Sequence, residues 1–208
     1  MRILFQGDSI TDASRIREEL TEMGRGYPLL VRASLGFEAP EKYEFINKGI
    51  SGNRIVDVYA RIKNDIINLK PDVMSILIGV NDVWHEFHES PNGVDAEKFF
   101  KIYDMLIEEV KAALPDIKIM ILEPFVLKES GTEENWEAFD KEVKKRAEKA
   151  KEIAKKYDLP FIKLQEGFDK LAETTENSYW LSDGVHPTPF GHEYIKNEWI
   201  KAFKDYVK

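Results

Sequence analysis

Residues 3–12 read ILFQGDSITD, and this stretch sets the expected fold. Ile3-Leu4-Phe5 is a short apolar run, which is typical of a buried strand, and Gly7 follows where the backbone must turn sharply. Ser9 then falls on the turn between this strand and a helix. The segment therefore predicts a strand, a tight turn and a helix, with a serine hydroxyl at the end of the strand.

The same pattern recurs along the rest of the chain. Helix-like stretches with apolar residues at helical spacing cover residues 95–114, which stop before Pro115, and the Lys/Glu-rich residues 135–157. Alternating strands and helices favour an α/β fold with a parallel sheet, helices on both faces and a ligand crevice at the carboxyl ends of the strands. The further strand-like runs are Phe45-Ile46, Val73 to Ile78, Ile117 to Leu122 and Phe161-Ile162.

Length and composition limit the classes of protein. The 208 residues, 43% of them hydrophobic, suit one domain spanning residues 1–208. The net charge of -8 gives no footprint for nucleic acid or an anionic membrane, and the absence of cysteine excludes disulfides and a thiol nucleophile. No signal-peptide core and no run long enough to span a bilayer is found, so we expect a cytoplasmic protein unless a leader has been removed.

A serine hydroxyl needs a base, and the base needs an acid to orient it. Asp183 lies three residues before His186, on a loop that contains Gly184 and Pro187. Such a loop can fold the carboxylate onto the imidazole. The alternatives are structural: Ser9 could cap the first helix, although Asp12 or Ser14 could do so instead, and Asp183 could form an Asx-turn beside a loop histidine.

Two further segments follow strands and carry hydrogen-bond donors. Residues 47–53, NKGISGN, contain glycines whose backbone N–H groups could point into the crevice, and Asn81 in residues 78–82 offers a side-chain amide. Donors aimed at a developing oxyanion are among the largest contributions to catalysis. Gly52 is the expected backbone donor, with Gly49 as the alternative.

The blocks GDSIT, GISGN, GVNDVW and DGVHP, in this order, resemble the four blocks of SGNH (GDSL-type) hydrolases over nearly the whole chain. The resemblance implies a flavodoxin-like three-layer α/β/α sandwich with a central parallel five-stranded sheet. It also implies a serine esterase in which Ser9 is the nucleophile, His186 the base and Asp183 its acid. The oxyanion donors would be Ser9 and Gly52 through their N–H groups and Asn81 through its amide. Ile10 stands where the GDSL name expects leucine, which is a conservative change.

Within this family, residues 48–53, residues 81–84, and His186 followed by Gly191-His192 look closest to bacterial acetylxylan-type and related carbohydrate acetyl esterases. This predicts a small-molecule ester substrate with a short acyl group, such as an acetylated sugar. The candidate substrate-binding residues are Trp84, Phe87 and Asp8, although both aromatic residues could equally be packing. Asp8 is also expected to tie neighbouring loops together, Asp12 to cap a helix, and the aromatic C-terminal segment could join subunits of a homo-oligomer.

Other functions fit the residues less well. A lysophospholipase or thioesterase of the same fold is the nearest alternative. Aspartyl phosphate chemistry on Asp8 lacks the expected second aspartate, because Ile10 stands two residues later. His85, Glu86, His88 and Glu89 favour a polar rim over a metal site, and no nucleotide-binding pattern supports a non-catalytic carbohydrate- or nucleotide-binding module, so we expect no cofactor and no metal.

Overall fold

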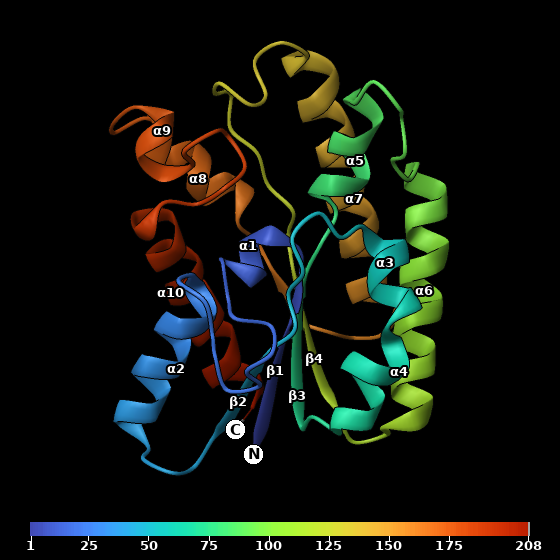
Figure 1. Cartoon of the computed structure of the whole chain (residues 1–208), viewed down its shortest axis with the longest axis vertical. Coiled ribbons are helices and arrows are strands. Elements are labelled where there is room, and N and C mark those ends of the chain that lie inside the picture. The colour runs from blue at the N-terminus through green and yellow to red at the C-terminus, as the bar shows by residue number, and fades with distance from the viewer. Residues whose placement is uncertain (208) are drawn as a thin grey trace.

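The computed structural model describes residues 1–207, and its centre is one sheet of five parallel strands (Figure 1). The strand order β2-β1-β3-β4-β5 is the flavodoxin-like order, and each of the five predicted strands is confirmed. The strands are β1 Arg2–Gly7, β2 Glu44–Asn47, β3 Val73–Leu77, β4 Lys118–Leu122 and β5 Phe161–Ile162.

Helices cover both faces of this sheet and complete the predicted three layers (Figure 1). Helices α2, α8 and α10 pack on one face, and α3, α4 and α6 pack on the other, while α7 contributes to both cores. The helices are α1 Ser9–Asp12, α2 Tyr27–Glu38, α3 Ile55–Ala60, α4 Ile62–Asp65, α5 Val80–Trp84, α6 Ala96–Ala113, α7 Trp136–Lys156, α8 Gln165–Ala172, α9 Asn177–Trp180 and α10 Pro189–Tyr206, with short 3₁₀ turns at Ile67–Leu69 and His85–Phe87.

The strands are short apolar runs because both of their faces are buried. Ile3 and Phe5 of β1 face one core, whereas Leu4 faces the other, and all three side chains are inaccessible to solvent. A strand of a parallel sheet covered by helices on both sides leaves no polar face. This accounts for a continuous apolar run rather than an alternating one.

The two long helices begin and end close to the predicted positions. Asp95 caps α6 by accepting a hydrogen bond from the backbone N–H of Lys98 at 2.9 Å. The helix ends at Ala113, before Pro115, whose ring cannot continue it. Helix α7 matches the predicted residues 135–157 to within one residue at each end.

The topology gathers three loops at one place. The chain leaves β1 for β2 on one side and returns to β3 on the other, so the strand order switches beside β1. Ligands bind at such a switch, outside the carboxyl ends of the strands. The loops after β1, β2 and β3 carry Ser9, Gly52 and Asn81. Among residues 1–207, no helix has the length and hydropathy needed to cross a bilayer.

Candidate active site

Ser9 is the first residue of α1 and lies on a sharp turn after β1. The turn needs glycine at position 7, because a Cβ there would collide with the backbone carbonyl of Leu77 on the neighbouring strand. The carboxylate of Asp8 caps α1 by accepting a hydrogen bond from the backbone N–H of Ile10 at 3.0 Å. The Ser9 side chain is thereby left half-buried at the end of the sheet.

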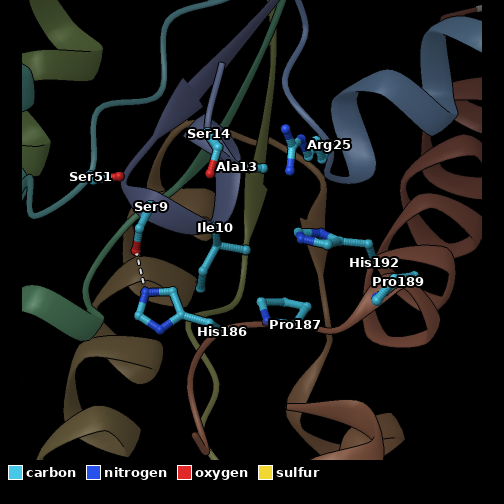
Figure 2. Close-up of a pocket in the computed structure, with 10 residues that line it drawn as sticks. All are labelled: Ser9, Ile10, Ala13, Ser14, Arg25, Ser51, His186, Pro187, Pro189 and His192. Atoms are coloured by element: carbon cyan, nitrogen blue, oxygen red, sulfur yellow. Dashed lines mark hydrogen bonds between the residues drawn. The ribbon is translucent and has the colours of Figure 1, made fainter. Parts of the chain in front are cut away.

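The loop before α10 brings an acid and a base to this serine. The Ser9 Oγ lies 2.8 Å from Nε2 of His186 (Figure 2), and Nδ1 of His186 lies 2.6 Å from a carboxylate oxygen of Asp183. The other carboxylate oxygen accepts hydrogen bonds from the backbone N–H groups of Val185 at 3.0 Å and His186 at 2.8 Å. Three predicted residues from opposite ends of the chain therefore form one connected row.

Backbone contacts fix the shape of this loop. Leu181 and Pro187 form an antiparallel bridge across it, and the N–H of Ser182 donates to the carbonyl of His186 at 2.9 Å. The segment after β4 also holds this loop. The N–H of Leu127 donates to the backbone carbonyl of Gly184 at 2.9 Å, and the N–H of Gly131 donates to the backbone carbonyl of Asp183 at 3.0 Å. Gly184 has a φ of +93°, which favours glycine.

The charges of this pair are coupled. Burial alone would raise the pKa of Asp183, but hydrogen bonds from the His186 ring and from two backbone N–H groups lower that pKa to about 2. The hydrogen bond to Asp183 in turn raises the pKa of His186, against the opposing effect of burial. An ionised Asp183 holds a proton on Nδ1 of the imidazole, so the lone pair of Nε2 faces the Ser9 hydroxyl.

Gly52 and Asn81 lie in the same hollow as Ser9. Both line an open hollow of about 310 Å³ that also contains Ser9 and His186. Gly52 has a φ of +81°, and no atom lies within 4 Å of the position that its Cβ would take. The Asn81 amide donates one hydrogen bond to the carbonyl of Asn53 at 3.1 Å, which orients the amide and leaves its second N–H available.

The carboxylate of Asp12 ties the loop after β2 to the serine turn. It is 2% exposed and accepts hydrogen bonds from the backbone N–H of Ser51 at 2.9 Å, from the Ser51 hydroxyl at 3.1 Å and from Arg17 at 2.6 Å. The predicted roles of two aspartates are thus exchanged: Asp8 is the helix cap, and Asp12 joins the loops. The reason is that α1 begins at Ser9, so the residue before it occupies the capping position.

Asp8 does not line the crevice, contrary to its place among the candidate substrate contacts. Its side chain is 1% exposed beneath the turn, where burial raises its pKa to about 7. Trp84 does lie at the crevice, and its ring centroid is 5.8 Å from that of His186. Phe87 packs on Phe139 and lines a separate hollow with Trp84, so it does not reach Ser9.

The two histidines after Asn81 form part of the crevice rim. His85 and His88 both line the hollow that contains Gly52, and their ring centroids are 5.2 Å apart. Within residues 1–207, no group of three or more His, Cys, Asp or Glu side chains is placed to hold a metal ion.

A second hollow opens on the other side of Ser9 and contains residues that the sequence did not single out (Figure 2). It has a volume of about 480 Å³ and runs from Ser9 and His186 to Arg25 and His192. His192 is buried, with 7% of its surface exposed. The only sequence signal for its role was the Gly191-His192 pair, and nothing marked Arg25.

The fold and the site define a serine hydrolase built on a flavodoxin-like parallel sheet. The model of the GDSL-like Lipase/Acylhydrolase family matches residues 5–194, and the chain belongs to this family. It is a serine carboxylic ester hydrolase, as the sequence predicted.

Individual relatives agree with this assignment. An acetylxylan esterase of Geobacillus stearothermophilus is 31% identical over 207 residues, covering 96% of this chain and 92% of the relative. A Parabacteroides merdae structure described as a GDSL-like lipase superposes with a TM-score of 0.91 at 32% identity, over 98% of this chain and 95% of the other. The acetylxylan esterase Axe2 of G. stearothermophilus superposes with a TM-score of 0.85 at 30% identity, over 97% and 93%.

Proposed function

We propose that this protein removes short acyl groups, chiefly acetyl, from carbohydrate esters through an acyl-enzyme on Ser9. The observation that carries the proposal is the row from Ser9 Oγ to His186 to Asp183, with contacts of 2.8 and 2.6 Å. The similarity to acetylxylan esterases supports the acetyl and carbohydrate parts of the proposal. A serine and an aspartate are described as catalytic in Axe2, in keeping with the same two residue types here.

The first half of the reaction forms the acyl-enzyme. The Ser9 hydroxyl gives its proton to Nε2 of His186 while Oγ attacks the ester carbonyl carbon. Asp183 stabilises the imidazolium that results, and its low pKa keeps it ionised at neutral pH. When the tetrahedral intermediate collapses, the carbon–oxygen bond to the alcohol breaks, and the leaving oxygen takes the proton from His186.

The second half returns the enzyme to its starting state. Water gives a proton to His186 and attacks the acyl carbon, and Ser9 Oγ then leaves with that proton. In both halves the carbonyl oxygen becomes negative. The N–H groups of Ser9 and Gly52 and the Asn81 amide are the donors for this oxyanion, and removal of one such donor typically costs about 10²–10³ in rate.

The test is a chain-length series on purified protein. We expect p-nitrophenyl acetate and acetylated xylo-oligosaccharides to be hydrolysed faster than p-nitrophenyl octanoate. Ser9→Ala should lower kcat by at least ~10³-fold, because the nucleophile is removed. Ser34→Ala on α2, away from the crevice, is the matched control and should retain activity.

Each part of the proposal can fail separately. Full activity of Ser9→Ala would refute the acyl-enzyme. Faster hydrolysis of the octanoate than of the acetate would refute the short acyl group and favour the lysophospholipase or thioesterase alternative. Hydrolysis of p-nitrophenyl acetate without any release of acetate from acetylated sugars would refute the carbohydrate substrate.

A further inference from the structure

The hollow between Ser9 and His192 is lined by a positively charged side chain and by no negatively charged one, although the chain as a whole is acidic. The chain carries 38 acidic and 30 basic residues, yet no acidic side chain lines this hollow of about 480 Å³. Away from Ser9 and His186, the polar side chains of this hollow are those of Arg25, His192, Ser14 and Ser51 (Figure 2). The Ser51 hydroxyl donates to Asp12, and the other three side chains have donors available to a ligand.

Arg25 differs from the other arginines of the protein. Within residues 1–207 its exposed guanidinium forms no ion pair and donates no hydrogen bond. The other seven arginines all donate from the side chain to a carboxylate, an amide or a backbone carbonyl; they are Arg2, Arg15, Arg17, Arg32, Arg54, Arg61 and Arg146. The one guanidinium with all its donors free is thus the one that faces the hollow.

The tautomer of His192 is fixed by its backbone contact. The N–H of Tyr27 donates to Nδ1 of His192 at 3.1 Å, so Nδ1 carries no hydrogen and Nε2 of the neutral ring carries one. The side chain is 7% exposed, and within the described residues Nε2 has no acceptor. Burial also lowers the pKa of His192 to about 4, with a smaller contribution from the charge on His186, so the ring stays a neutral donor.

Close packing holds this ring in place. The ring of His192 packs directly on Gly26, since a Cβ at that position would lie only 2.8 Å from Cε1 of the ring. The N–H of Arg25, one residue earlier, donates to the carbonyl of Ala13 at 2.8 Å, so the backbone that carries the guanidinium is fixed beside the hollow. The two donors are therefore built on anchored segments.

We propose that this hollow is a subsite for a carboxylate on the alcohol half of the ester, so that the preferred substrate is an acetylated acidic sugar of the uronic acid type. Arg25 supplies the opposite charge, and Nε2 of His192 and the Ser14 hydroxyl donate hydrogen bonds to the same group. This inference rests on the proposed function, because it assigns the substrate class of the same site.

The alcohol half, rather than the acyl half, suits this hollow for two reasons. The leaving oxygen must receive its proton from Nε2 of His186, which lines both hollows, so an alcohol placed in this hollow can be protonated. An acetyl methyl group also fills only a small part of such a volume. The candidate oxyanion donors Gly52 and Asn81 line the other hollow, so the carbonyl oxygen points away from Arg25.

A matched pair of substrates tests the proposal. The methyl glycosides of acetylated glucuronic acid and acetylated glucose differ only in a carboxylate against a hydroxymethyl group. We expect kcat/KM to be about tenfold higher for the acidic sugar, and this ratio to fall toward one in Arg25→Gln and in 0.5 M NaCl. Arg25→Lys should keep part of the ratio, and Lys101→Gln, which removes one positive charge from α6, should leave it unchanged.

Binding to Ser9→Ala gives a second readout that does not depend on turnover. Calorimetric titration should show tighter binding of methyl glucuronoside than of methyl glucoside, and Arg25→Gln in the same background should remove the difference. Equal kcat/KM for the two acetylated sugars, or a preference that survives Arg25→Gln, would overturn the subsite while leaving the esterase proposal standing. Absence of all ester hydrolysis, with Arg25-dependent binding retained, would overturn the proposed function and leave the subsite.

Discussion

Replacing Asp12 with asparagine is predicted to impair catalysis as well as stability, because this carboxylate holds the loop that carries Gly52. One of its oxygens accepts hydrogen bonds from the Ser51 N–H, from the Ser51 hydroxyl and from Arg17. Asparagine keeps the shape but loses the charge and one acceptor oxygen. A buried hydrogen bond to a charged group contributes ~1.5–3 kcal/mol, so the free energy of unfolding should fall by about 2 kcal/mol.

The effect on rate follows from the position of the loop. If the N–H of Gly52 moves away from the developing oxyanion, each 1.4 kcal/mol of lost stabilisation lowers the rate about tenfold. We expect kcat on p-nitrophenyl acetate to fall about tenfold or more in Asp12→Asn, while KM changes little. Ser51→Ala removes only the hydroxyl contact and should have a smaller effect.

The assay combines urea unfolding with steady-state kinetics on the same preparations. Asp104→Asn is the matched control, because Asp104 on α6 accepts hydrogen bonds from Lys156 at 2.6 Å and Tyr157 at 2.8 Å on the far side of the sheet. It should lose stability without losing kcat. A variant at Asp12 that is destabilised but turns over at the wild-type rate would refute the link between this carboxylate and the proposed oxyanion donor Gly52.

Three further results are expected. His186 must be neutral to act as the base, and its hydrogen bond to Asp183 raises its pKa, so kcat/KM should fall on acidification with a midpoint above pH ~6.5. Asp183→Asn should lower that midpoint, and an unchanged midpoint would contradict the effect of Asp183 on the pKa of His186. The folded pKa of Asp183, about 2, lies below its unfolded value, so its stabilising contribution is complete above pH ~4 and is lost as pH falls toward 2; the difference in unfolding free energy between wild type and Asp183→Asn should shrink over this interval, and a constant difference would contradict it. Gly26→Ala places a Cβ 2.7 Å from the Cβ of Ala13 and 2.8 Å from Cε1 of His192, so thermal unfolding should show a loss of about 1–3 kcal/mol. An unchanged Tm would contradict the close packing of both side chains against Gly26.

The sheet was predictable because its strands are buried on both faces. Each apolar run lies close to Gly, Pro, Asn or Asp, and all five runs are strands in the expected parallel sheet. The segments with Ser9, Gly52 and Asn81 each follow a strand, so these residues were expected at one edge of the sheet, where the carboxyl ends of parallel strands meet. His186 follows no strand, and its place beside Ser9 was expected from its spacing to Asp183 and from the family resemblance.

Features set by local turn geometry were not predictable. Whether Asp8 or Asp12 caps α1 depends on the residue at which the helix begins, and a shift of a few residues exchanges their roles. Arg25 lies in a stretch without periodicity, and only the fold brings it beside His192 from the last helix. Substrate contact and packing were both open for Phe87, and the structure favours packing, because a 3₁₀ turn follows α5 and the Phe87 ring lies against Phe139.

The antiparallel bridge between Leu181 and Pro187 has a consequence for how activity is lost on heating. Asp183 and His186 lie on the same short hairpin, so their hydrogen bond does not depend on the position of the hairpin in the molecule. The alignment of this hairpin with the serine turn depends on the rest of the molecule, which includes the hydrogen bonds from the N–H groups of Leu127 and Gly131 to the hairpin. On heating, we therefore expect activity to be lost when the hairpin separates from Ser9, while His186 is still hydrogen-bonded to Asp183.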